Sequence, residues 1–156
     1  MPLERGTLVR AVACFALLTS ALLPVACFVG TVCGAATSGD LDCLPLGRFW
    51  LAGLNAWGVA GFWTGAALVI SVLAPTRGAS SLAFAGAVTV GLTLDTTARL
   101  SPQVEYLARF TPFGYLRPAD VAAGASHWLP HTLGLTAAGA ALVLLASALE
   151  SRRRRA

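Results

Sequence analysis

The sequence predicts an all-α fold: a polytopic membrane protein with four transmembrane helices and a short amphipathic, re-entrant segment before the last of them. The first observation is compositional, because 56% of the 156 residues are hydrophobic and only 12% are charged, which is unlike a soluble domain. The second is that the hydrophobic residues form four blocks, each close to the length of about 20 residues that crosses a bilayer. The third is that arginines separate and flank these blocks. We treat residues 1–156 as one transmembrane domain.

The first transmembrane helix is predicted over residues 11–34, an uncharged block with Pro24 as the point where it would bend. The alternative is a secretory signal peptide, with Val25-Ala26-Cys27 as a cleavage or lipidation site. Two observations favour the membrane span. The apolar run continues to about Ala36, which is long for a signal core, and Pro24 stands where a lipoprotein signal would have leucine.

The second transmembrane helix is predicted over residues 49–74, after a polar loop with two aspartates. Small residues fall on one side of this block, and such residues permit close helix packing. They are Gly53, Gly58, Gly61 and Gly65. Asn55, near the start of the block, is a polar group inside the membrane. We interpret it as a hydrogen-bonding partner of another helix rather than as a substrate contact.

The third transmembrane helix is predicted over residues 81–98, after a tight turn that contains Arg77. Asp95 is the acid that lies within an apolar block, and an ionisable group at membrane depth is costly and often functional. Arg99 follows four residues later, which is the spacing of an ion pair along one helix face. We favour this ion pair, formed at the membrane interface, over a functional role for Asp95.

Residues 101–121 differ from the rest of the chain because they mix charge, aromatic rings and proline. Pro102, Pro112 and Pro118 interrupt any long helix and hold the preceding residue in extended geometry. Between the first two prolines, apolar and charged residues alternate in a pattern that predicts a short amphipathic helix. Phe113, Tyr115 and Arg117 then add the rings and the cation that settle at a membrane–water boundary. The alternative is an ordinary loop between two transmembrane helices.

The fourth transmembrane helix is predicted over residues 131–149 and is followed by a basic tail, residues 150–156. His127 and His131 have the spacing of two metal ligands on one helix face. Because no third ligand is nearby in the sequence, we favour interfacial side chains at a helix entry, with Pro130 in the first turn. The arginines of the tail are expected to contact membrane lipids rather than nucleic acid.

The placement of arginine predicts a multi-pass protein of the cell membrane with both termini in the cytoplasm. In this orientation seven arginines lie inside, which are Arg5, Arg10, Arg77 and Arg152 to Arg155. Four lie outside, which are Arg48, Arg99, Arg109 and Arg117. Segment 101–121 is therefore expected on the outer face.

The four cysteines fit this topology. Cys14 and Cys27 fall inside the first span and are expected to be packing residues. Cys33 and Cys43 bracket the first outer loop, where an oxidising compartment would allow a disulfide. Two free thiols fit the spacing equally well.

No group of residues in the sequence supports an enzyme. The chain has no lysine, which excludes a P-loop lysine, a Schiff-base lysine and a Ser–Lys dyad. No nucleophile elbow or adjacent Cys–His pair is present. We therefore expect no catalytic, cofactor-binding or metal-binding residues, and ATP hydrolysis linked to this protein would occur on another chain.

Residues 104–124, VEYLARFTPFGYLRPADVAAG, resemble the "LxxLSPFxYxxPxxxxxG"-like stretch that precedes the last spanning helix of type-2 ABC exporter permeases. The matching positions are Leu107, Phe110, Pro112, Phe113, Tyr115, Pro118 and Gly124, with Thr111 in place of the usual serine. Residues 68–78, LVISVLAPTRG, resemble the end of the family's antepenultimate helix. Residues 2–10 resemble the sequence that follows its cytoplasmic coupling helix. The similarity extends along nearly the whole chain, and its specific part is the Pro-Phe-x-Tyr region.

The resemblance implies a permease subunit that moves a substrate out of the cell while a separate ABC ATPase subunit hydrolyses ATP. It also implies a second permease chain, identical or different. Family members usually have six spanning helices, and the four predicted here match the last four in order and orientation, so a shortened or split permease is expected. In the resemblance, the outer segment caps the translocation path and meets the partner chain. The candidate gate or interface residues are Phe110, Pro112, Phe113, Tyr115, Arg117 and Pro118.

Two other functions are compatible with the sequence. A four-helix membrane scaffold or regulatory subunit would need neither an ATPase nor a translocation path. A small homo-oligomeric channel is less favoured, because no predicted span carries a regular polar stripe that could line a pore. The small-residue spans do not indicate which substrate an exporter of this kind would carry.

Overall fold

The computed structural model describes residues 5–39, 46–124 and 128–153. In these ranges all regular structure is helical, and four helices are long and apolar enough to cross a membrane. They are α1 (Arg5–Ser38), α2 (Leu46–Leu73), α3 (Arg77–Leu100) and α5 (Trp128–Arg153). Each predicted span lies within one of them, except that α2 ends one residue before the predicted boundary at residue 74. The structure thus supports an all-α membrane protein.

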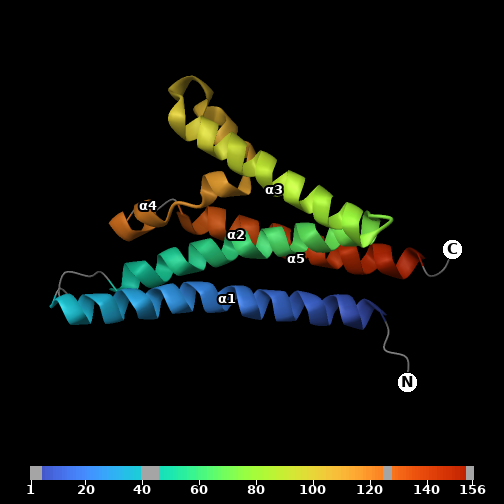
Figure 1. Ribbon diagram of the computed structural model, residues 1–156, viewed down its shortest axis with the longest axis horizontal. Coiled ribbons are helices and arrows are strands. Elements are labelled where there is room, and N and C mark those ends of the chain that lie inside the picture. The colour runs from blue at the N-terminus through green and yellow to red at the C-terminus, as the bar shows by residue number, and fades with distance from the viewer. Residues whose placement is uncertain (1–4, 40–45, 125–127, 154–156) are drawn as a thin grey trace.

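Helices α1, α2 and α5 run alongside one another as a bundle (Figure 1), and each contacts the other two. Helix α2 is central and makes its most extensive contacts with α5. Because α2 has apolar residues on all of its sides, it can pack against more than one neighbour. The start of α1, the end of α5 and the turn between α2 and α3 lie at one end of the molecule (Figure 1). This arrangement agrees with four successive crossings in alternating directions.

The contact between α2 and α5 depends on glycines that let the two backbones approach each other. A Cβ atom added to Gly65 would lie 2.6 Å from the carbonyl oxygen of Gly139. One added to Gly139 would lie 2.7 Å from the carbonyl oxygen of Gly61. Real Cβ atoms essentially never lie this close to a backbone oxygen, so both positions require glycine. We call this contact the α2–α5 seam. Gly61 and Gly65 are among the small residues that the sequence predicts for close packing, whereas Gly53 of the same set faces Pro24 of α1.

Helix α1 packs on both α2 and α5, with its larger contact on α2. The indole nitrogen of Trp57 donates a hydrogen bond of 3.1 Å to the carbonyl oxygen of Leu17, and the rings of Phe28 and Trp50 meet edge to face. Pro24 lies inside α1, which continues through it as one helix. The expectation that Cys14 and Cys27 are packing residues is wrong, because both side chains are exposed on α1. Inside a membrane, this exposed surface of α1 would face lipid or another chain.

Helix α3 diverges from the bundle of α1, α2 and α5, so its far end lies away from α2 (Figure 1). Thr76 caps its first turn by accepting a hydrogen bond of 3.2 Å from the backbone nitrogen of Ala79. The two helices are close at the turn that joins them and separate toward Leu100, leaving a wedge-shaped space between them. Residues 101–124 fold back into this space as three short helices, η2, η3 and α4.

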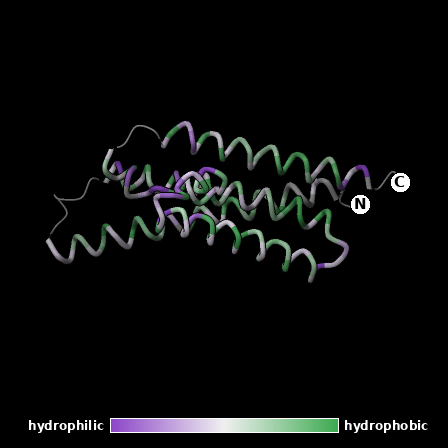
Figure 2. Tube along the Cα trace, turned by 90° about the horizontal axis from the view of Figure 1, so that it is seen from above, coloured by the Kyte–Doolittle hydropathy of each residue, from purple (hydrophilic) through white to green (hydrophobic). Residues whose placement is uncertain are grey.

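The distribution of hydropathy follows this architecture. The long helices are hydrophobic along most of their length, and hydrophilic residues gather near the helix ends and in the folded part between them (Figure 2). Large hydrophobic side chains are exposed on the long helices, for example Phe15, Leu82 and Leu133. Such surfaces suit a hydrocarbon environment.

Candidate functional site

The candidate site is the segment between α3 and α5, which the three prolines divide into short helices. These are η2 (Pro102–Phe110), η3 (Pro112–Tyr115) and α4 (Pro118–Ala123), and each has proline at its start. Proline is favoured there because the first helical residue needs no N–H donor. Ser101 and Thr111, which precede prolines, are extended as predicted. The prediction is wrong for Arg117, which precedes Pro118 and has φ −128° and ψ 63°. The predicted amphipathic helix is present as η2, a 3-10 helix interrupted by non-helical geometry at Val104.

Helix η3 is a turn stabilised by hydrogen bonds among its own residues and to residues just before it. The Thr111 hydroxyl accepts a hydrogen bond of 3.1 Å from the backbone nitrogen of Gly114, which explains why a hydroxyl side chain precedes the proline. Gly114 is buried against Ala108, and an added Cβ would fall on the Ala108 carbonyl. The Tyr115 hydroxyl donates a hydrogen bond of 2.9 Å to the carbonyl oxygen of Arg109. The sequence Thr-Pro-Phe-Gly-Tyr therefore specifies one compact turn.

The ring of Phe113 fills the wedge between α2 and α3. It lies 5.2 Å, centroid to centroid, from the ring of Trp63 in α2. It also lies 3.4 Å from the position that a Cβ of Gly91 in α3 would occupy. Gly91 is nine residues from the end of α3, which corresponds to about 14 Å along the helix axis. The segment therefore re-enters the space between the long helices.

Asn55 connects the segment to α2 and α5 and is completely buried. Its amide nitrogen donates to Thr132 Oγ1 in α5 at 2.8 Å and to the carbonyl oxygen of Tyr115 at 3.1 Å. Its amide oxygen accepts from the backbone nitrogen of Arg117 at 3.2 Å. The predicted hydrogen bond to another helix is confirmed, and the same side chain also satisfies two backbone groups of the segment.

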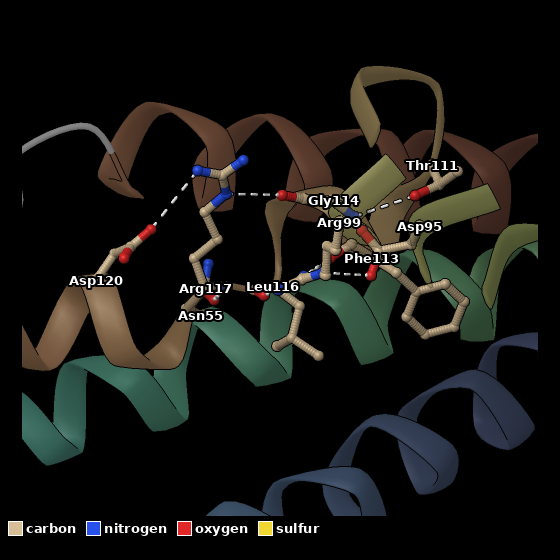
Figure 3. A network of polar contacts seen from close by, with 9 residues as sticks. All are labelled: Asn55, Asp95, Arg99, Thr111, Phe113, Gly114, Leu116, Arg117 and Asp120. Carbon is tan, nitrogen blue, oxygen red and sulfur yellow. Dashed lines mark hydrogen bonds and ion pairs between the residues drawn. The ribbon is translucent and has the colours of Figure 1, made fainter. Parts of the chain in front are cut away.

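Arg99 connects the segment to α3 (Figure 3). Its Nε donates to Asp95 Oδ2 at 2.8 Å, so the predicted ion pair along α3 is confirmed. Its Nη2 donates to the carbonyl oxygens of Phe113 at 3.3 Å and Leu116 at 3.2 Å. Asp95 is buried and orients the guanidinium toward these carbonyls, so the ion pair also holds η3 against α3.

The remaining candidate residues differ in exposure. Arg117 donates from Nε to the carbonyl oxygen of Gly114 at 3.1 Å, and its Nη1 lies 3.6 Å from Asp120 Oδ2 (Figure 3). The ring of Tyr115 lies 4.9 Å from that of His131 in α5. Phe110 is 78% exposed. Phe113 and Tyr115 are thus engaged inside this chain, whereas Phe110 is available to a partner.

Two cavities adjoin the segment. One, of about 650 Å³, lies among η2, η3, α4 and the start of α5. The other, of about 450 Å³, lies between the end of α3 and the segment and is lined in part by Asp95 and Arg99. Residues of α1 and α2 line neither cavity in the described part of the chain.

The structure brings together no metal site from the described residues. His127, of the weighed histidine pair, and Cys43, of the weighed disulfide, lie outside those residues. The ring of His131 packs against that of Tyr115, and the placement of His131 at the membrane interface stays a prediction.

Three contributors to the site do not stand out in the sequence. Gly114 occupies the unspecified position of the Pro-Phe-x-Tyr motif, yet it is the position with the closest backbone contact. Thr132 is a buried partner of Asn55 but resembles any other threonine in an apolar span. The bonds from Arg99 to two carbonyls join residues 14 and 17 positions apart. One feature of the site could have been predicted from the sequence: Thr111 directly before Pro112 is typical of a helix start and indicates the beginning of η3.

Comparisons with protein-family models, curated proteins and solved structures found no match to this chain. A functional proposal therefore has to rest on the geometry of the segment and on the residues that hold it.

Proposed function

We propose that this chain is the permease subunit of an ABC-type exporter, which moves a substrate out of the cell while a separate subunit hydrolyses ATP. The observation that carries the proposal is the re-entrant segment before the last long helix, with the ring of Phe113 between α2 and α3. This geometry suits a plug that closes a path from one side of the membrane. It is also the segment in which the sequence resembles type-2 exporter permeases.

The side chains of Arg99 and Asn55, which anchor the segment to the long helices, are arranged as a moving gate would need. Arg99 ties η3 to α3, whereas Asn55 ties it to α2 and α5. A change in the angle between α3 and the α2–α5 pair would strain one of these connections and displace the ring of Phe113. Irregular backbone is tolerated at membrane depth only where its polar groups are satisfied, and these side chains meet that requirement.

The proposed assembly includes a second permease chain, an ABC ATPase and membrane lipids. Because the two cavities lie at one end of the molecule and α1 and α2 line neither of them, a path across the membrane would need a further chain. Phe110, at 78% exposed, is the candidate of the outer segment best placed to meet that chain. We assign both termini to the cytoplasm because more arginines then lie inside than outside.

The same cavity arrangement supports a second candidate, a membrane scaffold or regulatory subunit. The residues that line the two cavities come from the segment and from the neighbouring ends of α3 and α5. A scaffold would use the exposed apolar surfaces of α1 and α3 to bind other membrane proteins. In that function the segment would be a rigid part of the fold and would have no gating role.

Purification from native membranes through an N-terminal tag distinguishes the exporter subunit from the scaffold. An exporter subunit retains an ABC ATPase, and the complex hydrolyses ATP in reconstituted vesicles. Recovery of folded protein with other membrane proteins and no ATPase would favour the scaffold.

The gating role is tested in the purified complex by replacing one aromatic ring at a time. We expect Phe113→Ala to uncouple ATP hydrolysis from transport, seen as a high basal rate that added substrates no longer change. Phe110→Ala is the matched control for loss of a ring, and we expect it to weaken assembly with the second chain while leaving coupling intact in the complexes that form. Normal coupling in the Phe113→Ala complex would contradict the gate.

A further inference from the structure

The larger cavity contains side chains of both charges around an aromatic wall. Its volume of about 650 Å³ is within the usual range for a small-molecule site. Two carboxylates and two guanidinium groups line it, from Glu105, Asp120, Arg109 and Arg117. Four of its other lining residues carry aromatic rings: Tyr106, Tyr115, Trp128 and His131. A ligand that fits this lining carries both charges in one compact group.

Two of the charged side chains have no partner within the described part of the chain. No hydrogen bond or ion pair involves the carboxylate of Glu105 or the guanidinium of Arg109, and both residues are exposed. Arg117 and Asp120 are 3.6 Å apart and each side chain is 55% exposed, so their pairing is loose. The cavity therefore offers an anion and a cation that no other side chain of the described residues occupies, and a pair that can open toward a ligand.

The aromatic rings of the cavity favour an ammonium group as the cation of the ligand. An ammonium group is attracted to the face of tyrosine or tryptophan, and a carboxylate close by attracts the same group through its opposite charge. A phosphate group is matched by arginine, whose planar guanidinium can donate two parallel hydrogen bonds. Tyrosine and tryptophan are also the residues that settle at the level of lipid headgroups.

We propose that this cavity binds a phosphate ester that carries an ammonium group, with the phosphate on Arg109 and Arg117 and the ammonium on Glu105 beside the aromatic wall. The headgroup of phosphatidylethanolamine and the soluble glycerophosphoethanolamine share this chemistry. The position of the cavity beside the ends of long apolar helices favours the lipid. The proposal does not depend on export, because a scaffold would present the same cavity.

The test is native mass spectrometry of the detergent-purified chain with added phosphatidylethanolamine, phosphatidylglycerol or glycerophosphoethanolamine. We expect one molecule of phosphatidylethanolamine to bind preferentially. Glu105→Gln and Arg109→Gln should each weaken this binding roughly tenfold, as expected for the loss of one charge-assisted contact. Both side chains are exposed, so neither change should prevent folding, and circular dichroism verifies this. Arg77→Gln, at the opposite end of α3, is the matched control and should leave binding unchanged.

Comparing the two lipids distinguishes the contact with the phosphate from the contact with the ammonium group. Phosphatidylglycerol has the phosphate without the ammonium, so Arg109→Gln should weaken its binding and Glu105→Gln should not. Binding of phosphatidylethanolamine that is unaffected by both substitutions, or no stronger than that of phosphatidylglycerol, would overturn the proposal. Comparable binding of glycerophosphoethanolamine would support the proposed chemistry and identify the soluble ester as a sufficient ligand.

Discussion

The α2–α5 seam and the re-entrant segment hold the molecule together in opposite ways. At the seam, glycines bring two regular helices into backbone contact, and Gly65 and Gly139 leave no room for a side chain. In the segment, the backbone is irregular, and long polar side chains reach across to its free carbonyl and amide groups. Asn55 and Arg99 supply these contacts from α2 and α3.

The difference follows from what each region must satisfy in an apolar environment. A regular helix pairs its own backbone groups, so its association depends on shape, and small residues give the closest fit. A chain broken by prolines leaves backbone groups unpaired, and each such group is costly until another part of the protein pairs with it. The steric fit of small residues therefore determines how α2 and α5 pack at the seam, whereas hydrogen bonds determine the conformation of the segment.

The largest expected effect comes from Gly139→Ala, which breaks the seam and leaves the polar anchors in place. The new Cβ would meet the backbone of Gly61, which cannot rotate away, so we expect the free energy of unfolding to fall by about 3 kcal/mol. Reversible denaturation in mixed detergent measures the change. Gly134→Ala, on the same helix with open space around it, is the control. It should raise stability slightly, by about 0.5 kcal/mol, because alanine favours the helix. Equal effects of the two substitutions would refute the seam.

Asn55→Leu changes a residue that contacts both regions. We expect it to lower the free energy of unfolding by about 2 kcal/mol, less than Gly139→Ala does. The substitution keeps a similar volume but leaves Thr132, the Tyr115 carbonyl and the Arg117 amide without their partner. The measurement is the same denaturation, together with hydrogen exchange at residues 115–117. Thr93→Val removes a hydroxyl that bonds only within α3 and serves as the control. Unchanged exchange at residues 115–117 would contradict the anchoring role of Asn55.

Arg99→Gln removes one anchor of the segment alone and has the smallest expected effect, about 0.5–1 kcal/mol. The side chain is 54% exposed, so water screens part of its interaction with Asp95. We expect faster hydrogen exchange in residues 113–116, with exchange in the middle of α2 and α5 unchanged. Arg77→Gln provides the comparison at the other end of α3. If exchange changed along α5 as strongly as in η3, the two regions would not be independent.

The sequence predicted the long helices well and the site in part. Hydrophobic blocks located α1, α2, α3 and α5, and the spacing of Asp95 and Arg99 identified their ion pair. The three prolines located the breaks in the segment. The partners of Phe113 and Asn55 were not predictable, because Trp63 and Gly91 lie in different helices, and the partners of Asn55 are 60 or more residues away. The exposure of Cys14 and Cys27 was missed because helix hydrophobicity does not distinguish a face toward protein from a face toward lipid.

The sequence by itself determined the helical content, the four apolar spans and the proline-bounded helices of the segment. These features depend on local properties: the hydrophobicity of consecutive residues, and the fixed φ and missing N–H of proline. Only the tertiary structure decided that α5, and not α3, packs most closely on α2, and that Phe113 fills the wedge left by α3. The physical reason is that helices hydrophobic on all sides have no preferred face. Steric fit between glycines and hydrogen bonds between distant residues then choose the neighbours.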